Sequence, residues 1–130
     1  MYNYDTPENA IKSLETAYTN HDLDAIINSK DFLNEAKFIL QSVSPKYDLE
    51  DKELVSETAK SLELRMILSM QNNGFPDFSI LKSDIYGLQR FNNDIYVVNE
   101  RLTYPDGSIY ETRIFLSFIN DIWKIALIEE

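Results

Sequence analysis

The apolar residues of this chain change their spacing once, near Pro76, and this change constrains the fold more than any other feature. From Thr6 to Met70 apolar residues recur at intervals of three and four, which is typical of helices packed on one side. From Ile80 to Glu129 the chain is rich in β-branched and aromatic residues separated by short polar turns, which is typical of strands. The sequence therefore predicts an α+β fold with helices first and a curved antiparallel sheet last.

Capping residues and breakers mark the expected helix boundaries. Thr6 can accept a hydrogen bond from a free amide and Pro7 needs no donor at the first helical position, so a first helix is predicted to about Thr19. Asp22 and Asp31 are predicted to cap a second helix and its continuation. Pro45 is predicted to end that continuation. A last helix is predicted from about Glu50 to Met70, and Asn72, Asn73, Gly74 and Pro76 form the signal that ends it.

Short turns between the apolar runs predict four strands in a meander. The predicted strands are Ile80 to Phe91, Ile95 to Tyr104, Ser108 to Ile119 and Ile122 to Glu129. A three-residue loop at Pro105 to Gly107 and a two-residue turn at Asn120 and Asp121 then set the register. The predicted cross-strand pairs are Arg101 with Glu111, Glu100 with Thr112, Phe118 with Trp123, and Leu116 with Ile125.

This register assigns each side chain to one face of the sheet, because successive side chains alternate. The face expected to meet the helices holds Tyr96, Val98, Leu102, Tyr104, Tyr110, Ile114, Leu116, Phe118, Trp123, Ile125 and Leu127. The opposite face holds Ile95, Val97, Phe115, Ile119, Ala126 and Ile128 beside Arg101, Glu111, Arg113 and Lys124. This second face is more apolar than a solvated sheet requires, which predicts a surface for a homodimer or another partner.

Charge and composition exclude several classes of function. Twelve basic against twenty-two acidic residues give a formal net charge of −10, which disfavours nucleic acid and anionic lipid and favours a basic protein or cationic ligand. The chain has no cysteine, no basic apolar leader and no apolar run near the ~20 residues that span a bilayer. We therefore expect a cytoplasmic protein that forms a single domain over residues 1–130.

Two patterns near the ends of the chain carry a resemblance to a known family. Residues Ala17 to Ala25 follow A-Y-x-N-x-D-L-D-A, and Trp123 to Ile125 read W-K-I. With the helix-then-strand order, they make nearly the whole chain resemble the nuclear transport factor 2-like superfamily, an α+β cone in which a curved sheet wraps around helices. The segment TPENAIKSLETAYTNHDLDAIINSKDFLNEAKFIL and the ending Ile-Glu-Glu are similar to bacterial immunity proteins of this fold. Such proteins neutralise a cognate polymorphic toxin by binding it, which implies neither catalysis nor a cofactor.

The acidic run DLEDKE supplies candidate partner contacts. Its carboxylates are Asp48, Glu50, Asp51 and Glu53, which we call the acidic segment. A solvated helix start explains these residues, because negative charge is favourable at the positive end of a helix dipole. If the protein binds a basic toxin, the same residues form a negative patch that complements it.

An enzyme of the same superfamily is the main alternative. The resemblance to isomerase-like and cyclase-like members implies a pocket between sheet and helices that contains a carboxylate base. Glu100 is the candidate base, and its predicted neighbours are Tyr96, Tyr110 and Thr112. Burial among tyrosines would raise the pKa of the Glu100 carboxyl, as a base requires. Asp84 and Tyr86 share a strand face and could also contribute, but the expected roles are an edge-strand charge for Asp84 and a core aromatic for Tyr86. A pocket filled by Tyr96, Tyr110, Phe118 and Trp123 would exclude this alternative.

A third alternative is a dimerisation or scaffold module that uses the second sheet face. No metal site is expected, because His21 is the only histidine and lies in a predicted turn. Asp22, Asp24 and Asp31 are interpreted as helix-capping residues, since the spacing and glycine of a calcium loop are absent.

Overall fold

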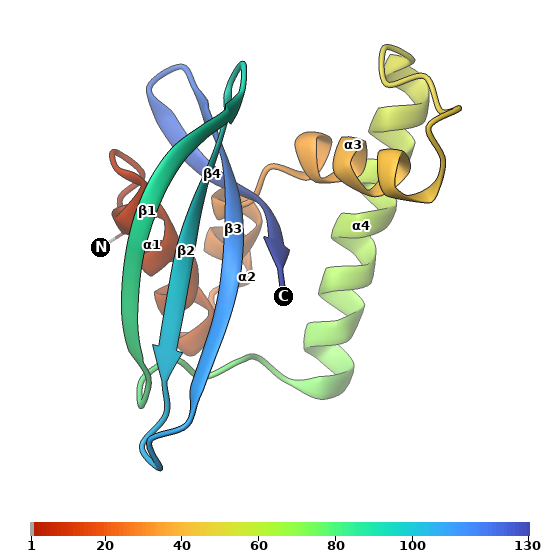
Figure 1. Ribbon diagram of the computed structural model, residues 1–130. Helices are drawn as coiled ribbons and strands as arrows, with labels where there is room; N and C mark the ends of the chain where they lie inside the picture. The colour runs from red at the N-terminus through yellow and green to blue at the C-terminus, as the bar shows by residue number, and fades with distance from the viewer. Residues whose placement is uncertain (1) are drawn as a thin grey trace.

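The computed structural model describes residues 2–130, which form four helices followed by a four-stranded antiparallel sheet (Figure 1). The helices are α1 (Pro7–Thr19), α2 (Leu23–Ser29), α3 (Phe32–Val43) and α4 (Lys52–Asn73). The strands are β1 (Lys82–Asn92), β2 (Ile95–Thr103), β3 (Ile109–Ile119) and β4 (Ile122–Glu129). They pair in the order β1-β2-β3-β4, so the predicted α+β meander is confirmed.

The predicted capping residues begin the helices. The side chain of Thr6 accepts a hydrogen bond from the Asn9 amide at 3.0 Å, and Pro7 occupies the first turn of α1. Asp22, Asp31 and Asp51 act in the same way at the starts of α2, α3 and α4. Each cap satisfies an amide that has no partner inside its helix, which fixes where the helix begins.

The predicted register is confirmed between β2 and β3 and over the first part of the β3–β4 pair. Arg101 lies opposite Glu111, and Glu100 lies opposite Thr112. Phe118 pairs with Trp123, and Leu116 pairs with Ile125. Asn120 and Asp121 have φ values of 55° and 62°, as a tight two-residue turn between twisted strands requires.

A β-bulge in β4 overturns the predicted faces of its last residues. Leu116 pairs with Ile125, but Phe115 pairs with Leu127 and Ile114 with Ile128, so Ala126 is the extra residue of β4. One extra residue in β4 reverses the alternation beyond that point. Leu127 was therefore wrongly assigned to the helix-facing side, and Ile128 was wrongly assigned to the opposite side.

The main core lies between the sheet and the first two helices. Its fully buried members come from α1, α2 and the strands: Ala10, Ile11, Leu14, Ala17, Ile26, Val98, Ile114, Leu116, Trp123 and Ile125. The apolar stripe predicted for the first helix supplies four of these residues. Burial of this stripe holds α1 against the sheet, with its main strand contacts to β4, and so defines one wall of the candidate site described below.

The chain then crosses to the opposite face of the sheet. Between α2 and α3, Lys30 forms a parallel bridge with Ile125, and the amide of Asp31 donates to the Ile125 carbonyl at 2.8 Å. Phe38 of α3 packs against Phe115 and Phe91, with ring centroids 5.0 and 6.1 Å away. Phe115 is consequently buried, so this part of the face predicted as a partner surface is covered by the chain itself.

Helix α4 packs mainly on α3 and stands away from the sheet (Figure 1). The two helices bury a small separate cluster of Ala36, Leu40, Val55 and Ala59. Beyond this cluster Leu64 and Leu68 remain 56% and 46% exposed. The apolar residues of α4 are thus partly buried against α3, which explains why this helix does not lie flat on the sheet.

Candidate functional site

A cavity of about 150 Å³ lies between α1 and the helix-facing side of the sheet. Its walls are mostly aliphatic and aromatic, and its interior polar groups are two glutamates, of α1 and β2, with the hydroxyls of Tyr18 and Thr112. The lining residues are Ile11, Leu14, Glu15, Tyr18, Phe78, Glu100, Leu102, Tyr110, Thr112, Ile114, Ile125, Ile128 and Glu130. An apolar cavity with a few convergent polar groups is the usual form of a small-molecule site.

Glu15 and Glu100, which we call the carboxyl pair, meet inside this cavity. Glu100 is only 4% exposed, and its Oε2 accepts a hydrogen bond from the Ser83 hydroxyl at 2.6 Å. The pKa of Glu15 is raised to about 9, mainly by burial and then by a hydrogen bond to Glu100 and repulsion from its charge, whereas Lys12 opposes the change. Two adjacent carboxyls hold one proton between them, so at neutral pH the carboxyl pair has one proton and one negative charge.

Tyrosines line the same cavity and link it to the surface. Burial raises the pKa of Tyr18 to about 12, and its ring stacks on Phe78 at 6.0 Å. Tyr110 is 40% exposed at the rim, where a hydrogen bond to Glu130 raises the pKa of its hydroxyl. Both phenols are therefore neutral near pH 7 and present polar hydroxyls together with aromatic faces.

The structure brings together most, but not all, of the predicted pocket residues. Glu100, Tyr110 and Thr112 line the cavity as expected. Tyr96 does not, because it packs edge-on against Trp123, with ring centroids 5.0 Å apart. Phe118 stacks on the same tryptophan at 4.4 Å, so this aromatic group fills another part of the face and leaves the cavity open.

Asp84 and Tyr86 do not line the cavity; Asp84 lies on an edge strand as expected, whereas Tyr86 is 41% exposed and is not a core aromatic. They pair with Arg101 and Asn99 on the opposite face of the sheet. The Tyr86 hydroxyl donates to Glu111 at 3.1 Å, and Arg101 also binds Glu111 at 2.7 Å. These residues form an exposed polar network on the side of the sheet away from α1.

Sequence reasoning missed Glu15, the second member of the carboxyl pair. Glu15 follows Ile11 by four residues and precedes Tyr18 by three, which places it on the buried face of α1. A glutamate at such a position within an apolar stripe was the available signal. Its partner could not be named in advance, because the contact between α1 and β2 depends on how the helix docks.

The carboxyl pair lacks a positively charged partner among residues 2–130. The ion pairs in this part of the chain join Lys30 to Glu35, Arg101 to Glu111 and Arg113 to Glu129. The same residues contain no group of three or more His, Cys, Asp or Glu side chains arranged to hold a metal ion. Buried charges in proteins are normally paired or bound to a metal, so the cavity contains an uncompensated negative charge.

The acidic segment lies elsewhere, at the outer end of the α3–α4 pair and away from the sheet (Figure 1). All four of its carboxylates belong to exposed residues and, within residues 2–130, none forms an ion pair. Asp51 caps α4, and Asp48 accepts a hydrogen bond from the Glu50 amide at 2.9 Å. The predicted helix-start role is confirmed for Asp51, while partner binding by this segment stays a prediction.

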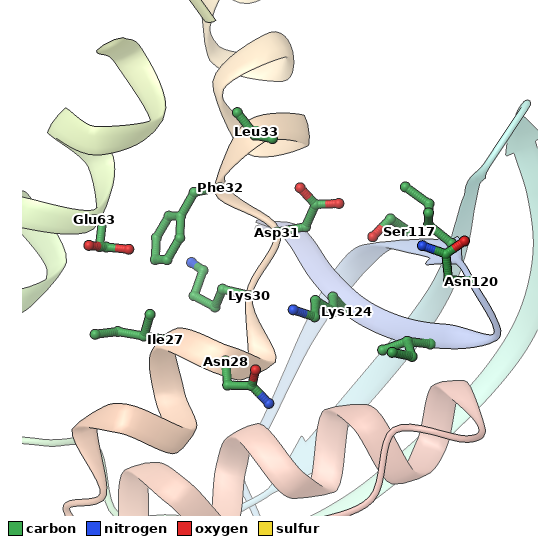
Figure 2. Close-up of a pocket in the computed structure, with 12 residues that line it drawn as sticks. Ile27, Asn28, Lys30, Asp31, Phe32, Leu33, Glu63, Ser117, Asn120 and Lys124 are labelled. Carbon is green, nitrogen blue, oxygen red and sulfur yellow. The ribbon is translucent and has the colours of Figure 1, made fainter. Parts of the chain in front are cut away.

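A larger hollow of about 530 Å³ lies between the α2–α3 connection, α4 and the β3–β4 hairpin. Figure 2 shows Lys30 and Phe32 between Glu63 of α4 and Lys124 of β4. Two lysines and two acidic residues share this hollow with apolar side chains, so no single ligand charge is favoured. The smaller cavity is the better candidate site, because Glu100 is buried in it and the pKa of Glu15 is strongly raised there.

Fold and cavity together define an α+β protein with a carboxyl pair held between its first helix and its sheet. Comparisons with protein-family models, curated proteins and solved structures find no match to this chain. The resemblance to the nuclear transport factor 2-like superfamily therefore stays a prediction. None of the helices within residues 2–130 combines the length and the hydropathy needed to cross a membrane.

Proposed function

We propose that this chain is a cytoplasmic immunity protein of the nuclear transport factor 2-like fold, which neutralises a basic bacterial toxin by binding it. The observation that carries the proposal is the projecting acidic segment, whose carboxylates are exposed and have no ion-pair partner within residues 2–130. The formal net charge of −10 adds a long-range attraction for a cationic partner. The curved sheet around α1 and α2 is compatible with the cone of that superfamily.

Affinity capture of the tagged protein from its native host, at low and moderate salt, tests this proposal. We expect one stoichiometric basic protein whose association rate falls as salt increases, because salt screens attraction between exposed charges. Recovery of a toxin whose activity is unchanged by the bound protein would contradict the immunity function. A salt-independent association rate would remove the electrostatic part of the proposal.

Neutralising the acidic segment tests where the toxin binds. The variant changes Asp48 and Asp51 to Asn and Glu50 and Glu53 to Gln; Asn at position 51 keeps a good helix cap. The matched control neutralises four exposed carboxylates on other elements: Glu8, Asp24, Asp94 and Asp121. We expect the first variant to slow association about tenfold more than the control. Equal effects of the two variants would place the contact elsewhere.

A second candidate function is small-molecule binding in the cavity, with isomerase-like or cyclase-like catalysis as its enzymatic form. The carboxyl pair favours this alternative, because it supplies a protonated donor beside a charged acceptor inside an apolar cavity. Glu100 would act as the base and Glu15 as the acid that polarises a carbonyl oxygen. Glu100→Gln should then abolish turnover of a small carbonyl compound while the protein stays folded; unchanged turnover would exclude Glu100 as the base.

A further inference from the structure

We propose that the cavity between α1 and the sheet binds a primary ammonium group carried on a short alkyl chain. The ammonium would lie against the carboxyl pair, and the alkyl chain would contact the aliphatic walls. This inference rests on the second candidate function, for which it names the class of ligand. It does not depend on toxin binding by the acidic segment.

Charge is the first argument for an ammonium ligand. The cavity has one buried negative charge on the carboxyl pair, and no ion pair within residues 2–130 compensates it. Lys12 is the nearest basic residue of α1, but it is exposed and lowers the pKa of Glu15 only as the weakest of the contributing effects. A monocation would supply the missing charge, and its N–H groups would donate to the carboxylate oxygens.

The walls of the cavity distinguish an organic ammonium from a metal ion. Beyond the two glutamates, the interior oxygen side chains are the hydroxyls of Tyr18 and Thr112, and the remaining walls are mostly aliphatic: Ile11, Leu14, Leu102, Ile114 and Ile125. Hard metal ions such as Ca²⁺ require six or more oxygen ligands, whereas an alkyl chain gains free energy by contacting aliphatic groups. The aromatic faces of Tyr18 and Phe78 are also favourable surroundings for a cation.

Size and access set the dimensions of the ligand. A cavity of about 150 Å³ accommodates a molecule of about the size of benzene, and butylammonium is of similar size. The rim contains the exposed side chains of Tyr110, Ile128 and Glu130, so the cavity communicates with solvent beside a third carboxylate. The same chemistry is offered by a free alkylamine and by the side chain of a lysine in a protein.

Titration with n-butylammonium chloride, followed by NMR of isotopically labelled isoleucine methyl groups, tests the proposal. The isoelectronic neutral control is 1-butanol, and Nα-acetyl-lysine N-methylamide represents a lysine within a protein. The methyls of Ile11, Ile114 and Ile125 report on the cavity, whereas Ile80 is 62% exposed and is not a lining residue. We expect saturable shifts of the lining methyls and at least about tenfold tighter binding of butylammonium than of butanol.

Three variants locate the charge that is recognised. Glu100→Gln should weaken butylammonium binding by about tenfold or more, because it removes the buried acceptor. Glu15→Gln keeps a neutral donor beside Glu100, so it should weaken butylammonium binding, but less than Glu100→Gln does. Glu57→Gln removes one exposed carboxylate of α4 and controls for net charge. If either cavity variant fails to fold, the comparison of butylammonium with butanol on the unchanged protein still decides.

Each result has a defined meaning. Equal binding of butanol and butylammonium would overturn the ammonium proposal and leave small-molecule binding in the cavity intact. Absence of shifts with every probe would overturn both. Equal weakening by Glu57→Gln and Glu100→Gln would indicate general attraction to an acidic surface and would also overturn the proposal. If butylammonium binds, comparable binding of Nα-acetyl-lysine N-methylamide would indicate that the ligand is the side chain of a protein lysine. Failure of this lysine derivative to bind would indicate a free alkylamine.

Discussion

Replacing Glu15 with glutamine should remove a pH dependence of stability that is unusual for a carboxyl group. Most carboxylates in proteins have lowered pKa values and stabilise the fold as pH rises. The pKa of the Glu15 carboxyl is raised from 4.5 to about 9, first by burial and second by the contact with Glu100. The folded chain therefore holds a proton that the unfolded chain releases above pH 4.5, so the free energy of unfolding falls as pH rises from about 4.5 to 9.

The size of this effect follows from the pKa change. One pKa unit corresponds to about 1.4 kcal/mol, so the full change corresponds to about 6 kcal/mol. Glu15 retains some contact with solvent and its interaction with Glu100 is mutual, so we expect a loss on the order of 2–4 kcal/mol. Glutamine cannot release a proton, so the Glu15→Gln protein should be nearly as stable at pH 9 as at pH 5. The unchanged protein should lose the amount given above over the same pH range.

Urea denaturation at pH 5, 7 and 9 measures this difference. The unchanged protein should show a midpoint that decreases with pH, and Glu15→Gln should show a nearly constant midpoint. His21→Gln is the control, because this chain has only one histidine and its side chain is exposed. Equal pH dependence of the unchanged protein and Glu15→Gln would refute the reasoning. Loss of the pH dependence in His21→Gln would assign it to the histidine.

Two further predictions concern the framework of the cavity. Leu116 of β3 is fully buried in the main core, so Leu116→Ala should lower the free energy of unfolding by about 2–5 kcal/mol in chemical denaturation. A loss below about 1 kcal/mol would show that this core is poorly packed. Gly87 has φ = 73°, and an added Cβ would lie 2.8 Å from the side-chain nitrogen Nδ2 of Asn99, so Gly87→Ala should lower the free energy of unfolding by more than about 1 kcal/mol. Gly107 has φ = 88° and no atom within 4 Å of an added Cβ, so Gly107→Ala should lower it by less.

Local sequence signals were sufficient for the order and the boundaries of the elements. Caps at Thr6, Asp22 and Asp31 act over three or four residues, so they can be read without knowledge of the fold. The turn at Asn120 and Asp121 fixed the register of the last hairpin for the same reason. The bulge at Ala126 escaped prediction, because the sequence around it has no glycine or proline to mark the extra residue.

The candidate site was only half predictable. Glu100 could be assigned to the helix-facing side because strand alternation is strict over the short distance from the hairpin turn. Glu15 was visible as a charge on an apolar stripe, but its role required a partner 85 residues away in the chain. The exclusion of Tyr96 from the cavity was equally unpredictable, because it depends on where Trp123 packs.

The sequence by itself determined the α+β order, the helix starts, the strand register near the turns and the acidic character of the surface, since these depend on neighbouring residues or on composition. Tertiary structure alone decided that α3 covers the second sheet face, that α4 stands apart on α3, and that two distant glutamates share a cavity. Such contacts depend on the docking of whole elements, in which many weak interactions compete. A pattern that extends over a few residues cannot specify that outcome.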